Sequence, residues 1–187
     1  DHAGSYYFRG IALTRLGRHK EAIESFEEAL QLDTGCASAA FQEGISYASL
    51  GRFSEAIEAY DRALRINPGF SDALYHKGFA LAKLGRNEDA VQEFDRTVAF
   101  DPKNAQAFHQ KGLQLAKIGR YEDAIESFDR SLELKPSYPQ ALYDKGTALV
   151  RLGRYEQALD AFGQTVAINP KYINAHFQSG LVLVQLG

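Results

Sequence analysis

The 187-residue sequence has no methionine, no tryptophan and a single cysteine, Cys36. One cysteine excludes an intramolecular disulfide and any cysteine-based metal cluster. No run of 18 apolar residues occurs, which excludes an ordinary membrane-spanning helix. There is also no basic-then-apolar secretory leader, so we expect a cytoplasmic protein. Because methionine is missing even from position 1, we expect a processed product or an excised piece of a longer chain.

The charge balance is close to neutral, with 21 Lys and Arg against 24 Asp and Glu and a formal net charge of -3. Such a balance gives the whole molecule no attraction to nucleic acid or anionic lipid. Apolar residues make up 45% of the chain and charged residues 24%, which is typical of a folded globular protein. The length suits one domain or one short repeat array.

The chain repeats itself every 34 residues, in five full units and the first half of a sixth. Each unit carries a Leu-Gly or Ile-Gly pair, usually followed by arginine, and a second glycine seven residues earlier. An alanine column and an aromatic column follow in phase. The earlier glycines are Gly10, Gly44, Gly78, Gly112, Gly146 and Gly180, and the aromatics are Phe26, Tyr60, Phe94, Phe128 and Phe162.

Each unit is predicted to form two helices, as residues 71–104 illustrate. Apolar spacing of three and four predicts a first helix over residues 73–84, which Gly85 ends. A second helix begins near Asn87 and ends at Asp101, because the following proline disfavours helix there. The short connections predict antiparallel neighbours. Glycine within a helix costs about 0.5–1 kcal/mol, so six glycines in one phase indicate close helix packing.

These columns resemble the tetratricopeptide repeat family over essentially the whole chain, although the tryptophan that the family often carries is missing. The Leu-Gly-Arg runs look prokaryotic or archaeal. The resemblance implies an all-α, right-handed superhelical solenoid of antiparallel helix pairs, with five repeats and a final lone helix. The expected single array over 1–187 has repeats 3–36, 37–70, 71–104, 105–138 and 139–172 and a half repeat 173–187.

A search for chemistry finds no phosphate-binding loop, dinucleotide fingerprint, nucleophile elbow or zinc-protease motif. No two of the five histidines are three or four residues apart, so no helical metal pair is predicted. The acidic residues cluster on second helices, where pairs such as Glu58–Arg62 and Glu126–Arg130 suit a solvated outer face. We therefore expect no enzyme, no cofactor and no metal.

In the resembled family, first helices line a concave groove. The matching columns here are an aromatic column, an aliphatic column one turn further, and a basic edge. A contiguous apolar patch with a basic edge favours an apolar partner with some acidic residues. The same aromatics would also suit the core, and the basic column would suit plain solvation; both readings stay open. The predicted partner-binding groove consists of Tyr7, Ile11, Phe41, Ile45, Tyr75, Phe79, Lys83, His109, Leu113, Lys117, Tyr143, Arg151 and Phe177.

The sequence thus predicts a protein–protein interaction scaffold that binds a peptide or helical segment in this groove. The carboxylate clamp of some family members is not expected, because aromatic and aliphatic residues replace its Lys and Asn. Two alternatives stay open: single-stranded nucleic-acid binding, which the net charge disfavours, and an accessory binding region of a larger enzyme.

The final segment is predicted to be a first helix with no second helix to cover it. Leu183 and Leu186 match Leu81 and Leu84, which are expected to face that missing partner. We expect either a longer parent chain or self-association through this C-terminal edge.

Overall fold

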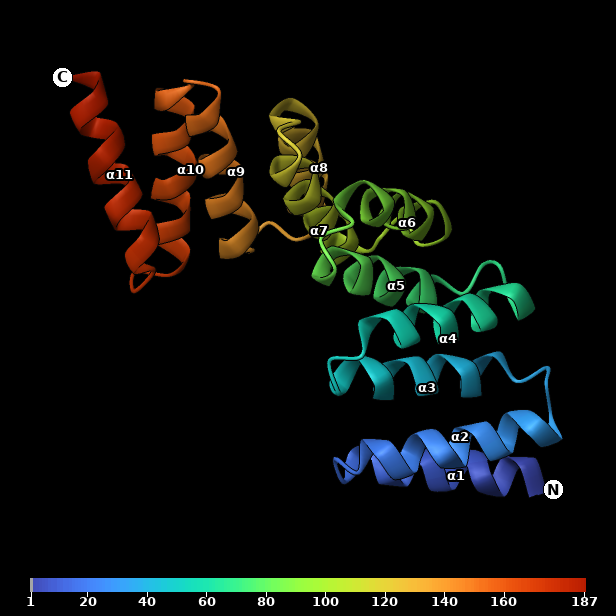
Figure 1. The fold of residues 1–187 in the computed structure, drawn as a ribbon. Helices are drawn as coiled ribbons and strands as arrows, with labels where there is room; N and C mark the ends of the chain where they lie inside the picture. Colours follow the sequence, from blue (N-terminus) through green and yellow to red (C-terminus); the bar gives the residue numbers. More distant parts are fainter. Residues whose placement is uncertain (1) are drawn as a thin grey trace. The chain divides into compact units, whose positions relative to one another are not determined.

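The computed structural model describes residues 2–187, which form eleven α-helices and no strand (Figure 1). This confirms the all-α architecture of five helix pairs and a last unpaired helix. The helices are α1 (His2–Arg15), α2 (His19–Leu32), α3 (Ala37–Ser49), α4 (Phe53–Ile66), α5 (Ser71–Lys83), α6 (Asn87–Phe100), α7 (Ala105–Lys117), α8 (Tyr121–Leu134), α9 (Pro139–Arg151), α10 (Tyr155–Ile168) and α11 (Ile173–Leu186).

The chain divides into two compact units, and each is described by itself. The first contains α1–α6 and ends at Phe100; the second begins at Asp101 and contains α7–α11. In both units each first helix except α11 packs on the second helix of its pair, and α2, α4, α8 and α10 also contact the first helix that follows. This stacking of helix pairs is that of an α-solenoid. The single array of 1–187 and the exact repeat boundaries stay predictions.

The Leu-Gly-Arg motif builds the turn inside each pair. The glycines at its centre have φ between +71° and +82°, in the left-handed region that glycine adopts without strain. The arginine N–H then donates to a carbonyl five residues earlier, as Arg86 does to Leu81 at 3.0 Å, which is a Schellman motif. The Arg86 side chain pairs with Asp89 in the first turn of α6 at 2.7 Å. The motif therefore ends one helix and starts the next.

The core of each pair is a glycine of the first helix lying against an aromatic ring of the second. A Cβ added to Gly44 would lie 2.5 Å from the Tyr60 ring, and one added to Gly146 would lie 2.5 Å from the Phe162 ring. The rings at this position, from Phe26 to Phe162, are fully buried. The prediction of close packing at this column is confirmed for the five glycines from Gly10 to Gly146.

Helix α11 lacks such a ring. Nothing lies within 4 Å of a Cβ added to Gly180. Val182 is buried against the rest of the unit, whereas Leu183 is 57% exposed and its counterpart Leu81 only 2%. Leu84 was also expected to face the second helix, and this was wrong. Leu84 is 43% exposed although α6 follows it, and its counterpart Leu186 is 42% exposed. The missing helix therefore uncovers Leu183 but does not account for the exposure of Leu186.

The contact between glycine and ring predicts opposite effects of alanine at two glycines of the second unit. Gly146→Ala forces a methyl group into the Phe162 ring and should destabilise the fold by about 1–3 kcal/mol. Gly163→Ala, inside α10 where no neighbour lies within 4 Å, should stabilise it by about 0.5–1 kcal/mol. Urea unfolding of both variants measures these changes. A neutral Gly146→Ala variant would contradict the packing described.

Candidate functional site

The predicted aromatic column lies against the second helices. Tyr7, Phe41, Tyr75 and Tyr143 are half-buried, and His109 is buried at 5% exposure. Each ring leans on the core ring of its own pair, with centroid distances from 5.7 to 6.1 Å; the pairs are Tyr7–Phe26, Phe41–Tyr60, Tyr75–Phe94, His109–Phe128 and Tyr143–Phe162. Phe177 on α11 has no second helix beside it and is 63% exposed.

The same column also contacts aromatic residues that the sequence reading overlooked. Phe70, Tyr138 and Tyr172 each stand at the N-cap of a first helix. Their rings lie 4.9 Å from Phe41, 4.9 Å from His109 and 5.2 Å from Tyr143, respectively. An aromatic two residues after each of three repeat-closing prolines was the signal in the sequence. These contacts join one repeat to the next.

One turn further along the first helices, the predicted aliphatic and basic residues are more accessible. Ile11, Ile45 and Leu113 are half-buried, and Phe79 is 36% exposed. Lys83 is exposed and holds its ammonium 5.1 Å from the centroid of the Phe79 ring, a cation–π contact. In the first unit, the accessible apolar and charged side chains of the predicted surface are therefore this pair on α5.

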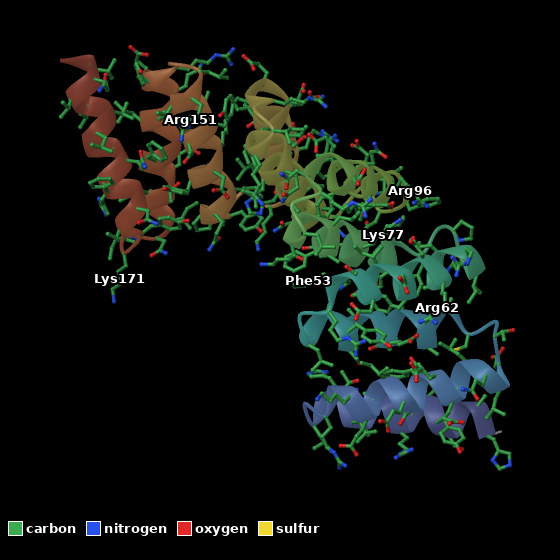
Figure 2. The ribbon with its side chains drawn as sticks, viewed as in Figure 1. Phe53, Arg62, Lys77, Arg96, Arg151 and Lys171 are labelled. Atoms are coloured by element: carbon green, nitrogen blue, oxygen red, sulfur yellow. The ribbon has the colours of Figure 1, made fainter. Side chains whose placement is uncertain are left out.

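In the second unit, the structure brings three predicted residues to one pocket of about 260 Å³. Leu113 and Lys117 come from α7. Arg151, which is labelled in Figure 2, comes from α9. Lys117 donates to the side-chain oxygen of Gln114 at 3.0 Å. The remaining lining residues supply an apolar wall and one carboxylate; they are Ala116, Tyr121, Phe128, Asp144, Thr147 and Ala148.

The carboxylate in this pocket is already engaged. Asp144 lies 2.7 Å from His109 Nε2, and the Tyr138 hydroxyl lies 3.1 Å from His109 Nδ1. Burial, and then the charge of Asp144, raise the pKa of Tyr138 above its usual value. With Asp144 held by this network, Lys117 and Arg151 leave the mouth of the pocket attractive to anions.

Charged residues on the first helices bind flanking second helices. Lys77 lies 2.8 Å from Asp61 and 2.7 Å from Glu93, so it bridges α4 and α6 (Figure 2). Arg96 also pairs with Glu93, at 2.8 Å. Lys145 pairs in the same way with Asp129 of α8 at 2.6 Å. These ion pairs hold neighbouring helices together. The only sign of them in the sequence is that lysines recur at one position of the first helices and acidic residues recur at one position of the second helices.

The expected ion pairs along the second helices were wrong. Arg62 does not pair with Glu58 but donates to Glu43 of α3 at 2.5 Å, and Glu43 is 1% exposed. Arg130 pairs with Glu133 and not with Glu126. Burial raises the pKa of Glu43, although the nearby Arg62 opposes the rise.

Two family models, both described as tetratricopeptide repeat, match the sequence. One matches residues 41–105 and 109–173, and the other matches residues 1–68. The chain belongs to the tetratricopeptide repeat family. Tetratricopeptide repeats are protein–protein interaction scaffolds, and in that general sense so is this chain. Comparison with curated proteins found no match.

Solved tetratricopeptide structures share the fold. YrrB, described as having an unusual peptide-binding site, is 25% identical with a TM-score of 0.84, covering 94% of this chain and 90% of its own. A MamA structure is 21% identical with a TM-score of 0.86, over 92% and 94%. MamA 41-end from Desulfovibrio magneticus RS-1 is 24% identical with a TM-score of 0.86, over 92% and 97%.

Two further features concern residues 2–187. No helix there is both long enough and apolar enough to cross a membrane. No three His, Cys, Asp or Glu side chains come together there as a metal site would require.

The buried Glu43 predicts a pH-dependent effect. Because folding raises its pKa above the ordinary 4.5, its contribution to stability is full below that value and is lost as pH rises through the folded pKa. Glu43→Gln removes this titration. The free energy of unfolding of the variant minus that of the wild type should therefore increase as pH rises from about 4 to about 7. Urea unfolding across this range tests it, and a constant difference would contradict it.

Proposed function

We propose that the first-helix surface of the second unit binds a peptide or helical segment of a partner protein. The observation that carries this proposal is the pocket between α7 and α9, where Leu113, Lys117 and Arg151 meet. A concave site with an apolar wall and a few polar groups is the usual form of a ligand site. The similarity to YrrB, a repeat protein with a peptide-binding site, supports the same assignment.

The chemistry of this pocket favours a partner with an apolar anchor beside an acidic residue. Leu113 and Ala148 offer apolar contact, while Lys117 and Arg151 are exposed cations. A carboxylate near the two cations gains attraction, whereas a basic segment would be repelled. Phe79 and Lys83 give α5 of the first unit the same pairing of apolar surface and positive charge.

A peptide suits these surfaces better than single-stranded nucleic acid. Bases would need free aromatic faces on which to stack. Rings such as Tyr75 and Tyr143 are instead half-buried against Phe94 and Phe162. We propose further that the chain binds in the cytoplasm without catalysing a reaction, either as an adaptor or as the binding region of a larger protein.

Peptide selection tests the pocket. Peptides selected from a random library against the whole chain should combine apolar and acidic residues. Their affinity should fall at least about tenfold for the double variant Lys117→Gln with Arg151→Gln, because each substitution removes one charge-assisted contact with the peptide carboxylate. Isothermal titration calorimetry measures the affinity.

The matched control for this test is Arg86→Gln with Arg120→Gln, which removes two exposed turn arginines that pair within their own turns. These variants should bind like the wild type. Selected peptides that are basic, or that bind the Lys117 and Arg151 variant unchanged, would refute the assignment.

We also propose that the chain self-associates through α11. Ile173, Phe177, Leu181 and Val184 follow one another at spacings of four, four and three, so they form one stripe on the helix. Their exposed fractions are 78%, 63%, 48% and 79%, in the same order, and α11 contains no charged residue. A second α11 is therefore an apolar match without like-charge repulsion, and a two-fold contact is self-complementary.

Sedimentation velocity across a concentration series tests the self-association. The wild type should dimerise as concentration rises, and Phe177→Glu with Leu181→Glu should stay monomeric because the glutamates would be buried unpaired. Leu186→Glu is the control, because Leu186 lies outside the stripe. Its exposure is close to that of its counterpart Leu84, which a second helix follows. A monomeric wild type, or equal disruption by Leu186→Glu, would refute the interface.

A further inference from the structure

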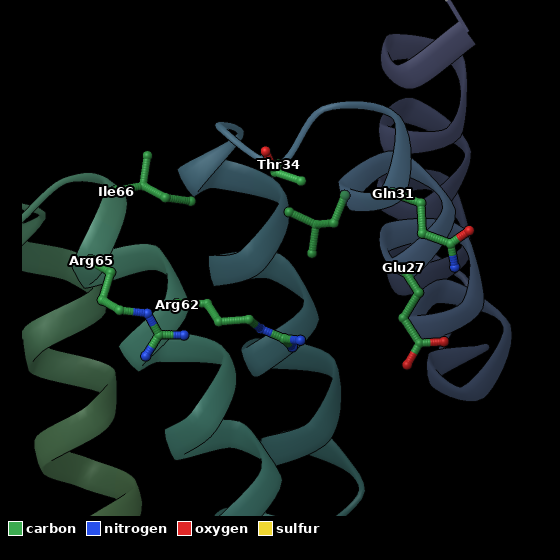
Figure 3. Close-up of a pocket in the computed structure, with 7 residues that line it drawn as sticks. Glu27, Gln31, Thr34, Arg62, Arg65 and Ile66 are labelled. Atoms are coloured by element: carbon green, nitrogen blue, oxygen red, sulfur yellow. The ribbon is translucent and has the colours of Figure 1, made fainter.

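A second pocket lies in the first unit, on the side of the second helices. It occupies about 540 Å³ between α2 and α4, beside the connection after α2, within the volume range of ligand sites. None of the predicted first-helix residues lines it. The lining residues are Glu27, Leu30, Gln31, Thr34, Arg62, Arg65 and Ile66 (Figure 3).

Two arginines three residues apart stand on the α4 side of this pocket. Arg62 and Arg65 are neighbours on one helical face, an arrangement that costs stability because like charges repel. At the same register of α8, Arg130 is followed by Glu133 and the two form an ion pair. Arginine replaces that glutamate in α4, so the local compensation found in α8 is missing here.

The two arginines are only partly neutralised by their surroundings. The Nη2 group of Arg62 donates to Glu43 beneath it at 2.5 Å, which leaves its other N–H groups for a further acceptor. Among the described residues, Arg65 forms no ion pair and its side chain is exposed. Figure 3 shows Arg62 extending from α4 toward the α2 side, with Arg65 beside it.

The rest of the pocket limits which anion fits. Leu30 is half-buried and Ile66 is 39% exposed, so they offer apolar contact next to the arginines. Glu27 stands on the opposite side, where its carboxylate lies 3.4 Å from the Tyr47 hydroxyl. This negative charge disfavours a dense polyanion such as a phosphate chain, whereas one carboxylate can bind at the far side on the planar guanidinium groups.

We propose that this pocket binds an acidic side chain of a peptide, with the carboxylate on Arg65 and Arg62 and a neighbouring aliphatic side chain on Leu30 and Ile66. The ligand resembles the one expected at the first-helix pocket, but the site lies in the other unit and on the second helices. It does not depend on the proposed function, and each site has its own variants.

Nuclear magnetic resonance titration of the whole chain tests the proposal. The probe is the blocked peptide acetyl-Ala-Leu-Glu-Leu-Ala-amide, and its partner probe carries Gln in place of Glu. The Glu peptide should shift the backbone amides of Thr34, Arg65 and Ile66 saturably, and it should bind at least about tenfold more tightly than the Gln peptide.

Arg65→Glu is the decisive variant, because it recreates the Arg–Glu spacing of α8 and so should keep the fold. It should lose the saturable shifts. Arg130→Gln, which removes the α8 counterpart of Arg62 outside this pocket, should keep them. The proposal is overturned by absent saturation, by equal binding of the two peptides, by wild-type binding to Arg65→Glu, or by inorganic phosphate binding these amides more tightly than the Glu peptide.

Discussion

The close contact between a first-helix glycine and a second-helix ring sets the geometry of every complete pair. With no Cβ on Gly44 or Gly146, the ring of Tyr60 or Phe162 occupies the place that a side chain would take. The ring is fully buried and the backbones approach closely. Side chains one turn away on the first helix then have a determined distance to the second helix, so the contact decides which become core and which stay accessible.

This constraint determines where along the first helix the side chains become accessible. The aromatic column lies next to the glycine, so Tyr75 and His109 lean on the core rings of their own pairs, and His109 also contacts Tyr138 at the N-cap of α9. One turn further the second helix no longer covers the surface, and Phe79 with Lys83, or Leu113 with Lys117, become accessible. The aromatic column therefore contributes chiefly to packing between helices, and the less regular residues one turn beyond it form the accessible surface.

The 34-residue period made the helices and the glycine contacts predictable, because both depend on residues inside one repeat. The turn at Gly85 and the Phe94 ring follow from positions only a few residues apart in the unit. Contacts between repeats were not predictable in the same way. Arg62 had acidic neighbours on its own helix and yet pairs with Glu43, since a buried carboxylate gains more from a cation than an exposed one does. The repeat period alone does not predict which of several acidic residues an arginine will pair with.

The proposed binding sites therefore depend on departures from the repeat more than on the repeat itself. An ideal unit makes these contacts within itself: a ring covers its glycine, and its arginine pairs with an acidic residue three positions later. Where α4 has Arg65 in the place that Glu133 fills in α8, a charge is left over beside a pocket. Where α11 has no ring beside Gly180, an uncharged apolar stripe is left over instead. Such uncompensated positions cost stability, because a charge or an apolar side chain there lacks the group that compensates it at the matching position of another repeat, and the proposed binding sites depend on them.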